Sequence, residues 1–260
     1  MNKTPQRLVL DSLQKAKESG MPLLAVLADP DKASLRQLSE WAYRSSQSEV
    51  DMLLIGGSLL ERERLELCVD ALKKAARKPV VLFPGNFLQV TARADALLFL
   101  SLISGRNAEL LIGQQVAAAH LLKNRPLEII GTGYVLIDGG RQTSVSYMSQ
   151  TMPIPGNKPD IAAMTALAGE LLGMQLIYLD AGSGAEVPVS VEVIERVREV
   201  INIPLIVGGG IRSASDFRAA AHAGADMVVV GTAAEKGSWP ENWKSELSPK
   251  LSIGRDIIRL

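Results

Sequence analysis

Short apolar runs recur along the whole chain, and stretches with a helical pattern separate most of them. The runs are apolar nearly throughout rather than alternating, which is typical of parallel strands buried on both faces. Eight such runs are found: Leu23–Ala28, Val50–Ile55, Val80–Phe83, Ala96–Leu100, Leu127–Ile137, Leu176–Leu179, Leu205–Val207 and Met227–Val230. Eight buried strands at this spacing predict an α/β fold that closes into a (β/α)8, or TIM, barrel rather than an open sheet.

The segments between these runs carry helix signals. Ser190 precedes an amphipathic stretch, and Ser213 has Asp216 three residues later, as in a capping box. Pro159 stands where a first helical residue would be, and Gly173 marks the end of the same helix. The signals predict helices that alternate with the strands.

One interval is too short for a helix. Only 12 residues separate Phe83 from Ala96, and they include Pro84, Gly85 and Asn86. Two loops and a packed helix need more chain than this. We therefore expect a modified barrel in which the helix after the third strand is missing, leaving an opening in the outer ring.

Composition narrows the class of protein. The 260 residues match the size of one (β/α)8 barrel and no linker divides them, so we expect a single domain over residues 1–260. The formal net charge is zero, which gives no support to nucleic-acid binding. The single cysteine, Cys68, excludes an internal disulfide and a Cys-rich metal site. A polar N-terminus and the lack of an apolar run near the ~20 residues that span a bilayer indicate a cytoplasmic protein.

The strongest chemical signal follows the last two predicted strands. Gly208-Gly209-Gly210-Ile211-Arg212-Ser213 follows the seventh strand, and Gly231-Thr232 follows the eighth. Residues just after barrel strands gather at one rim, where glycines let backbone N–H groups approach an anion and the helix starting at Ser213 adds its positive end. Three glycines alone are compatible with a plain tight turn. The two motifs together predict a phosphate site that includes Gly209, Gly210, Gly231 and Thr232.

A carboxylate follows the first predicted strand and a hydroxyl follows the second. Asp29 begins Asp29-Pro30-Asp31-Lys32, and Ser58 follows Gly56-Gly57. Mg2+ prefers one or two carboxylates together with substrate phosphate oxygens, so Asp29 and Ser58 are candidate Mg2+ ligands. The alternative is that Asp29 caps the following helix, since Pro30 suits a helix start. Lys32 either meets a diphosphate or is a solvated lysine.

The sixth predicted strand leads into Tyr178-Leu179-Asp180-Ala181-Gly182-Ser183-Gly184. A carboxylate at the rim can accept a proton from a substrate hydroxyl or hydrogen-bond it, and the loop glycines expose amides to the same substrate. The ring of Tyr178 can stabilise a developing positive charge. Asp180 and Tyr178 are therefore candidate catalytic residues, and a turn-forming Asp180 is the plain alternative.

Together these motifs resemble those of the geranylgeranylglyceryl phosphate synthases and their bacterial heptaprenylglyceryl relatives. The resemblance runs from Pro22 to Glu235 and also includes Phe83-Pro84-Gly85 and the segment from Tyr147 to Pro155. The Gly-Gly-Gly-Ile-Arg motif is shared with other phosphate-binding barrels, whereas six motifs in this order are specific. One branch of the family has a lysine near Leu27-Ala28, so the chain is more similar to the other branch, which is archaeal and partly bacterial.

The resemblance implies a barrel with its third helix replaced and a prenyltransferase activity. In that reaction the C3 hydroxyl of sn-glycerol 1-phosphate attacks C1 of geranylgeranyl or a similar prenyl diphosphate, and pyrophosphate leaves with Mg2+ help. By position, Asp29 and Ser58 would bind Mg2+. Tyr178, Leu179, Asp180, Ala181, Gly182, Ser183, Gly184, Gly209, Gly210, Gly231 and Thr232 would hold the glycerol phosphate. Asp180 stands where the family usually has Glu, which shortens the carboxylate by one methylene.

The resemblance also implies a homo-oligomer, dimer or hexamer, and a transient membrane contact through the lipid product. The opening near Phe83–Arg93 is expected to let a long apolar tail leave the barrel. Three alternatives stay open: a sugar-phosphate isomerase or another small-phosphate enzyme with the same phosphate glycines, an FMN-binding barrel in which these glycines take the FMN phosphate, and an inactive barrel that binds a phosphorylated ligand or acts as an oligomeric scaffold. An isomerase would not need Asp29 with Ser58 as a metal pair.

Overall fold

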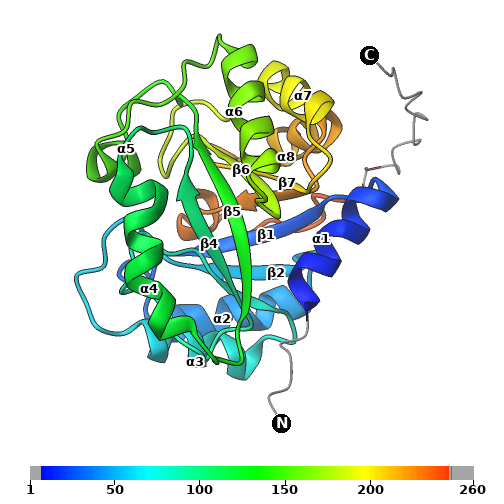
Figure 1. Ribbon diagram of the computed structural model, residues 1–260. Coiled ribbons are helices and arrows are strands. Elements are labelled where there is room, and N and C mark those ends of the chain that lie inside the picture. Colours follow the sequence, from blue (N-terminus) through cyan, green and yellow to red (C-terminus); the bar gives the residue numbers. More distant parts are fainter. Residues whose placement is uncertain (1–6, 246, 248–260) are drawn as a thin grey trace.

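Eight parallel strands close into a barrel in chain order (Figure 1). The computed structural model describes residues 7–245 and 247. The strands are β1 (Leu23–Ala28), β2 (Met52–Ile55), β3 (Val80–Leu82), β4 (Ala96–Leu102), β5 (Glu128–Leu136), β6 (Leu176–Asp180), β7 (Leu205–Gly208) and β8 (Met227–Val230). The predicted (β/α)8 class is confirmed, and each strand begins and ends within two residues of the predicted bounds.

Helices surround the barrel. They are α1 (Leu8–Ser19), α2 (Leu35–Ser46), α3 (Leu65–Ala75), α4 (Gln114–Leu122), α5 (Ser144–Ser149), α6 (Pro159–Leu171), α7 (Val191–Val200), α8 (Ala214–Ala223) and α9 (Thr232–Glu235), and a π-helical turn, η1 (Glu109–Gly113), leads into α4. The predicted caps are confirmed: Ser190 caps α7, and Ser213 with Asp216 forms a capping box at α8. Within residues 7–245, no helix is long and apolar enough to cross a bilayer.

Alternation along the strands divides the core into two layers. One set of side chains fills the barrel interior, and the other packs between the barrel and its helices. On β6, Leu176 and Tyr178 point inward, whereas Ile177 and Leu179 point outward. Because successive side chains point to opposite faces, Asp180 shares the inward set and lies at the barrel mouth.

The helix predicted to be missing after the third strand is absent. No helix is found between β3 and β4 in this described segment, so the prediction is confirmed. The loop in its place is held by Gln89, a buried side chain that donates to the carbonyl of Gly57 (2.9 Å) and accepts from the amide of Gly85 (3.0 Å). The loop is therefore tied to the end of β2, where Ser58 lies.

Helix α1 closes the opposite end of the barrel. Its buried residues Val9, Leu10 and Leu13 join the interior core. The carboxylate of Glu128, the first residue of β5, accepts the amides of Val9 and Leu10 at 2.9 Å each. These amides lie at a helix start and have no partner within the helix, so Glu128 fixes α1 across this end.

Candidate active site

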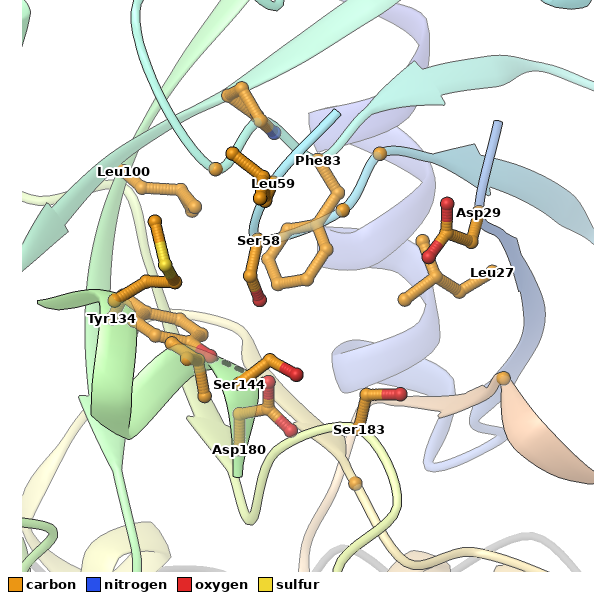
Figure 2. A pocket seen from close by; sticks show the side chains of 18 of the residues that line it. Leu27, Asp29, Ser58, Leu59, Phe83, Leu100, Tyr134, Ser144, Asp180 and Ser183 are labelled. Carbon is orange, nitrogen blue, oxygen red and sulfur yellow. Dashed lines mark hydrogen bonds between the residues drawn. The ribbon is translucent and has the colours of Figure 1, made fainter. Parts of the chain in front are cut away.

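A cavity of about 930 Å³ opens at the rim formed by the C-terminal ends of the strands (Figure 2). Its polar end is lined by residues at or just after the ends of β1, β2, β6, β7 and β8, among them Asp29, Ser58, Asp180, Gly210 and Thr232. These are the strand ends at which the sequence placed the phosphate and metal residues.

The other end of the cavity is apolar. It extends over Leu97 and Phe99 to Ala118 of α4. Leu97 and Phe99 belong to the layer outside the barrel. The helix missing after β3 would lie close to this outer face of β4, so its absence leaves room for the apolar arm.

Asp180 is buried and hydrogen-bonded at both carboxylate oxygens. Its Oδ2 accepts the hydroxyl of Tyr134 (2.6 Å; Figure 2), and its Oδ1 accepts the amide of Gly182 (2.8 Å). Burial raises the pKa of Asp180, and the bonds from Tyr134 and Gly182 partly oppose that shift. A carboxylate with a raised pKa is a better proton acceptor than an ordinary exposed one.

Glycines bring the β6 and β7 loops into contact. Gly209 has φ +79°, and a Cβ there would lie 2.5 Å from Oδ1 of Asp180 and 2.6 Å from the amide nitrogen of Gly182. At Gly210, with φ +73°, a Cβ would lie 2.8 Å from backbone atoms of Val187 and Pro188. Only glycine combines this backbone conformation with this approach. The β7 glycines thus support Asp180 as well as the rim.

The amides offered to an anion come from two strand ends. Among the hydrogen bonds of the described residues, none uses the backbone N–H of Gly209, Gly210, Gly231 or Thr232. The start of α8 differs, because Asp216 accepts the amides of Arg212 (2.9 Å) and Ser213 (3.0 Å). Asp216 therefore already accepts two of the amides that the start of α8 was expected to offer to a phosphate. The amides of the glycines after β7 and β8 are still available to an anion.

Tyr178 forms part of the aromatic floor of the cavity. Its ring stacks on Phe83 with centroids 5.0 Å apart and an interplanar angle of 18°, and it meets Tyr134 edge to face at 5.7 Å. Burial, with the Asp180 charge adding to it, raises the pKa of Tyr178, which keeps the phenol neutral. The ring can act on a ligand through its π face.

Asp29 is held in place at the end of β1. Its Oδ1 accepts the amide of Asp31 (3.0 Å), and Lys32 Nζ lies 3.1 Å from its Oδ2. A Cβ at Gly57 would lie 3.4 Å from the Asp29 carboxylate, so the carboxylate lies beside the segment that carries Ser58. The Ser58 hydroxyl points into the same cavity (Figure 2).

Lys32 also faces a second carboxylate, Glu235 of α9, at 3.7 Å. Partial burial lowers the pKa of Lys32, but Glu235 and Asp29 together raise it above its ordinary value. Burial raises the pKa of Glu235; the Lys32 charge lowers it and the Asp29 charge raises it, and the balance is a raised value. One ammonium group thus lies between two carboxylates.

The donors near Asp29 fit a hard divalent cation. Asp31 contributes a buried oxygen, Oδ1, that has no hydrogen-bond partner in the described part of the chain. Within residues 7–245, no group of three or more His, Cys, Asp or Glu side chains is suited to hold a metal. Mg2+ does not require one, since it is often held by one or two carboxylates, water and substrate phosphate. Asp29 with Ser58 therefore stays a suitable candidate pair.

Comparison with known proteins places this site in a family. Residues 18–246 match the PcrB family. The chain belongs to the PcrB family. Relatives of this chain include a geranylgeranylglyceryl phosphate synthase from Spirosoma linguale, 52% identical over 224 residues that cover 86% of this chain and 90% of the relative. The synthase of the same name from Thermococcus gammatolerans is 42% identical over 253 residues, 97% of each chain.

A solved structure of a geranylgeranylglyceryl phosphate synthase resembles the fold closely. The (S)-3-O-geranylgeranylglyceryl phosphate synthase from Thermoplasma acidophilum, in complex with its substrate sn-glycerol-1-phosphate, superposes with a TM-score of 0.83 at 33% identity, over 89% of this chain and 93% of that one. An N-acetylmannosamine-6-phosphate 2-epimerase from Clostridium perfringens has a TM-score of 0.53 at 13% identity, which shows the fold alone.

Most of the predicted site residues of this PcrB-family member line one cavity. They are Asp29, Ser58, Tyr178, Asp180, Ser183, Gly184, Gly209, Gly210, Gly231 and Thr232. Gly182 reaches the site through its amide to Asp180. Leu179 and Ala181 instead pack their side chains into the outer layer, so only their backbone is available to a ligand.

Sequence reasoning missed Tyr134, Glu235 and Gln89. Tyr134 pairs with Tyr178 in the β5–β6 register, which places its hydroxyl beside Asp180. The available signal was a tyrosine near the end of an otherwise apolar strand, since a buried hydroxyl usually has a partner. Register is not readable from one strand, so the partner could not be named.

Proposed function

We propose that this protein is a prenyltransferase that forms an ether bond between the C3 hydroxyl of sn-glycerol 1-phosphate and geranylgeranyl, or a similar prenyl, diphosphate. The observation that carries the proposal is one cavity with two chemistries, a polar end with Asp180 and glycine amides and an apolar arm over β4. Its relatives from Spirosoma linguale and Thermococcus gammatolerans are named geranylgeranylglyceryl phosphate synthases.

The reaction needs placement and charge stabilisation rather than a covalent enzyme intermediate. The bond between C1 and the diphosphate oxygen breaks, the bond between C1 and the glycerol C3 oxygen forms, and the hydroxyl proton passes to Asp180. Holding the hydroxyl near C1 and excluding water supplies much of the acceleration. The aromatic faces of Tyr178 and Phe83, which both line the cavity, suit the positive charge that develops on the allylic carbon.

Asp29 and Ser58 are the residues proposed to hold Mg2+. When bound, the metal neutralises charge on the departing diphosphate. The glycine amides of Gly209, Gly210, Gly231 and Thr232 are proposed to hold the glycerol phosphate. The apolar arm between β4 and α4 is proposed to take the prenyl chain. A homo-oligomer and a transient membrane contact remain predictions.

Replacing Asp29 by Ala is expected to reduce ether formation by at least about 100-fold, because the metal's contribution is worth several kcal/mol. Purified protein is incubated with Mg2+, sn-glycerol 1-phosphate and geranylgeranyl diphosphate, and the product is detected by mass spectrometry. Asp29→Asn repeats the test with the carboxylate's shape retained. Asp70→Ala, on α3 and paired with Arg93, is the control.

Two results would contradict this reading. Wild-type protein that forms no ether with any prenyl chain length, yet binds a phosphate ester, would indicate another phosphate enzyme on the same barrel. Product formation by Asp29→Ala at the wild-type rate would remove Asp29 from the reaction.

Replacing Tyr134 by Phe is expected to move the acid limb of the pH–activity profile to higher pH. The Tyr134 hydroxyl lowers the pKa of Asp180, so its loss raises that pKa further and leaves less ionised Asp180 at a given pH. A hydrogen bond to a charged group is worth about 1.5–3 kcal/mol, so the rate on the acid limb should fall about tenfold or more. The profile of kcat/KM against pH measures this, and an unchanged limb with a uniformly lower rate would assign Tyr134 to packing alone.

A further inference from the structure

The position of Lys32 suggests a role that the proposed reaction does not yet use. Its ammonium lies between Asp29, a proposed metal ligand, and Glu235, which follows the proposed phosphate residues Gly231 and Thr232. All five residues line the same cavity. The Asp29 and Glu235 side chains are only 18% and 20% exposed, whereas that of Lys32 is 54% exposed and has more room to move.

Arg212, another cation that lines the cavity, is held differently. Arg212 donates to the backbone carbonyls of Ala185 and Glu186 (2.9 Å to the latter), so it braces the β6 loop. Lys32 instead contacts Asp29 Oδ2, the carboxylate oxygen that does not accept the Asp31 amide and that lies beside Gly57. Two cations at one carboxylate oxygen repel each other, so Lys32 and a divalent ion are competitors there.

Glu235 offers Lys32 a second carboxylate partner when the ammonium leaves Asp29. The Glu235 amide donates to the carbonyl of Gly231 (3.1 Å), so Glu235 lies one helical turn after the motif proposed to bind phosphate. An ammonium that leaves Asp29 and stays near Glu235 therefore remains beside the bound phosphates. A lysine is a strong ligand for phosphate oxygens.

We propose that Lys32 is a phosphate-binding residue that occupies Asp29 in the free protein, gives up this position to a divalent cation, and is kept at the rim by Glu235, its positioning residue. The identity of the phosphates rests on the proposed function. The ligand is a phosphate oxygen of either the prenyl diphosphate or the glycerol phosphate, and binding measurements with separate probes distinguish the two.

The test is isothermal titration of wild-type protein and Lys32→Met with three probes. With MgCl2 alone, Lys32→Met should bind Mg2+ about two- to fivefold more tightly, because a competing cation is gone. With inorganic pyrophosphate in saturating Mg2+, or with sn-glycerol 1-phosphate, at least one ligand should bind about tenfold more weakly. The ligand that loses affinity is the one that Lys32 contacts. Unchanged Mg2+ affinity, or unchanged affinity for both phosphate ligands, would overturn the proposal.

A double-mutant cycle tests the role of Glu235. Glu235→Gln removes the second partner of Lys32, so Lys32 should compete harder for Asp29 and Mg2+ should bind more weakly. The loss should be larger in the wild-type background than in Lys32→Met, where only the direct charge effect remains. Equal losses in both backgrounds would mean that Glu235 does not act through Lys32.

The control is Lys73→Met, which removes another lysine–aspartate pair, Lys73 with Asp95, away from the cavity. Its binding constants should equal those of the wild type. The binding constants do not depend on catalytic turnover. The proposed function and the proposed exchange of Lys32 with a cation at Asp29 can therefore be refuted separately. Wild-type protein without ether formation would refute the proposed function, whereas active wild-type protein with unchanged Lys32→Met binding would refute the exchange.

Discussion

Asp180→Asn is expected to lower kcat by about 10²–10⁴-fold, the usual contribution of a positioned general base. Asn keeps the shape of Asp, and its carbonyl oxygen can still accept the amide of Gly182, which Asp180 Oδ1 accepts at 2.8 Å. What Asn cannot do is accept the hydroxyl proton. Single-turnover formation of the ether product measures the loss, and Asp180→Glu should retain activity because it keeps the carboxylate.

The same substitution is expected to change how the stability of the protein depends on pH. Burial raises the folded-state pKa of Asp180 above its unfolded value. The folded state then binds more protons between the two pKa values, so stability falls as pH rises through that window and stays lower above it. Asn does not titrate, so this fall with pH should be absent from Asp180→Asn, and thermal unfolding at several pH values measures the difference. A wild-type kcat in Asp180→Asn would show that Asp180 is not the general base. If Asp180→Asn were much less stable, its low activity could reflect misfolding, and the activity of Asp180→Glu would then separate the two explanations.

Gly209→Ala is expected to reduce kcat/KM by about 100-fold or more, because two costs combine at this position. A non-glycine residue at φ +79° costs about 1–2 kcal/mol. The added Cβ would also push Asp180 Oδ1 and the Gly182 amide out of place, since it would lie 2.5 and 2.6 Å from them. Small displacements of reacting groups are known to cost as much as 10²-fold in rate. Steady-state kinetics against sn-glycerol 1-phosphate measures the effect.

Two matched glycines separate these costs. Gly173→Ala, at φ +90° with nothing within 4 Å of the new Cβ, tests the backbone strain alone and should keep full activity. Gly231→Ala, whose Cβ would meet only Leu27 at 3.9 Å or more, should fold normally and raise KM only if a phosphate lies against it. Full activity of Gly209→Ala would contradict the tight contact between the β6 and β7 loops.

The barrel could be predicted from the sequence because each strand is buried on both faces. Each strand therefore appears as a continuous apolar run, and polar residues, prolines or glycines mark where the run begins and ends. It also predicted the missing helix, since 12 residues cannot hold one. The rim glycines could be named because the expected phosphate contacts use their backbone amides, which the motif alone identifies. These are local properties, and one sequence contains them.

Side-chain contacts between different strands could not be predicted from one sequence. The Tyr134–Asp180 bond depends on the β5–β6 register, and the contact of Glu235 with Lys32 joins β8 to β1 across the closure of the barrel. Leu179 and Ala181 show a different limit. They were grouped with the site by motif, although strand alternation already indicates that residues on either side of Asp180 point away from the mouth.

Helix α1 gives the barrel only one usable end. Val9, Leu10 and Leu13 fill the floor, and Glu128 holds the helix there. Ligands therefore reach the site from the other end, where the polar rim and the apolar arm over β4 lie. The expected routes of the two products differ, with pyrophosphate leaving from the polar rim and the lipid leaving along the apolar arm. Closing one end of the barrel thus confines binding and release to the end that carries the site.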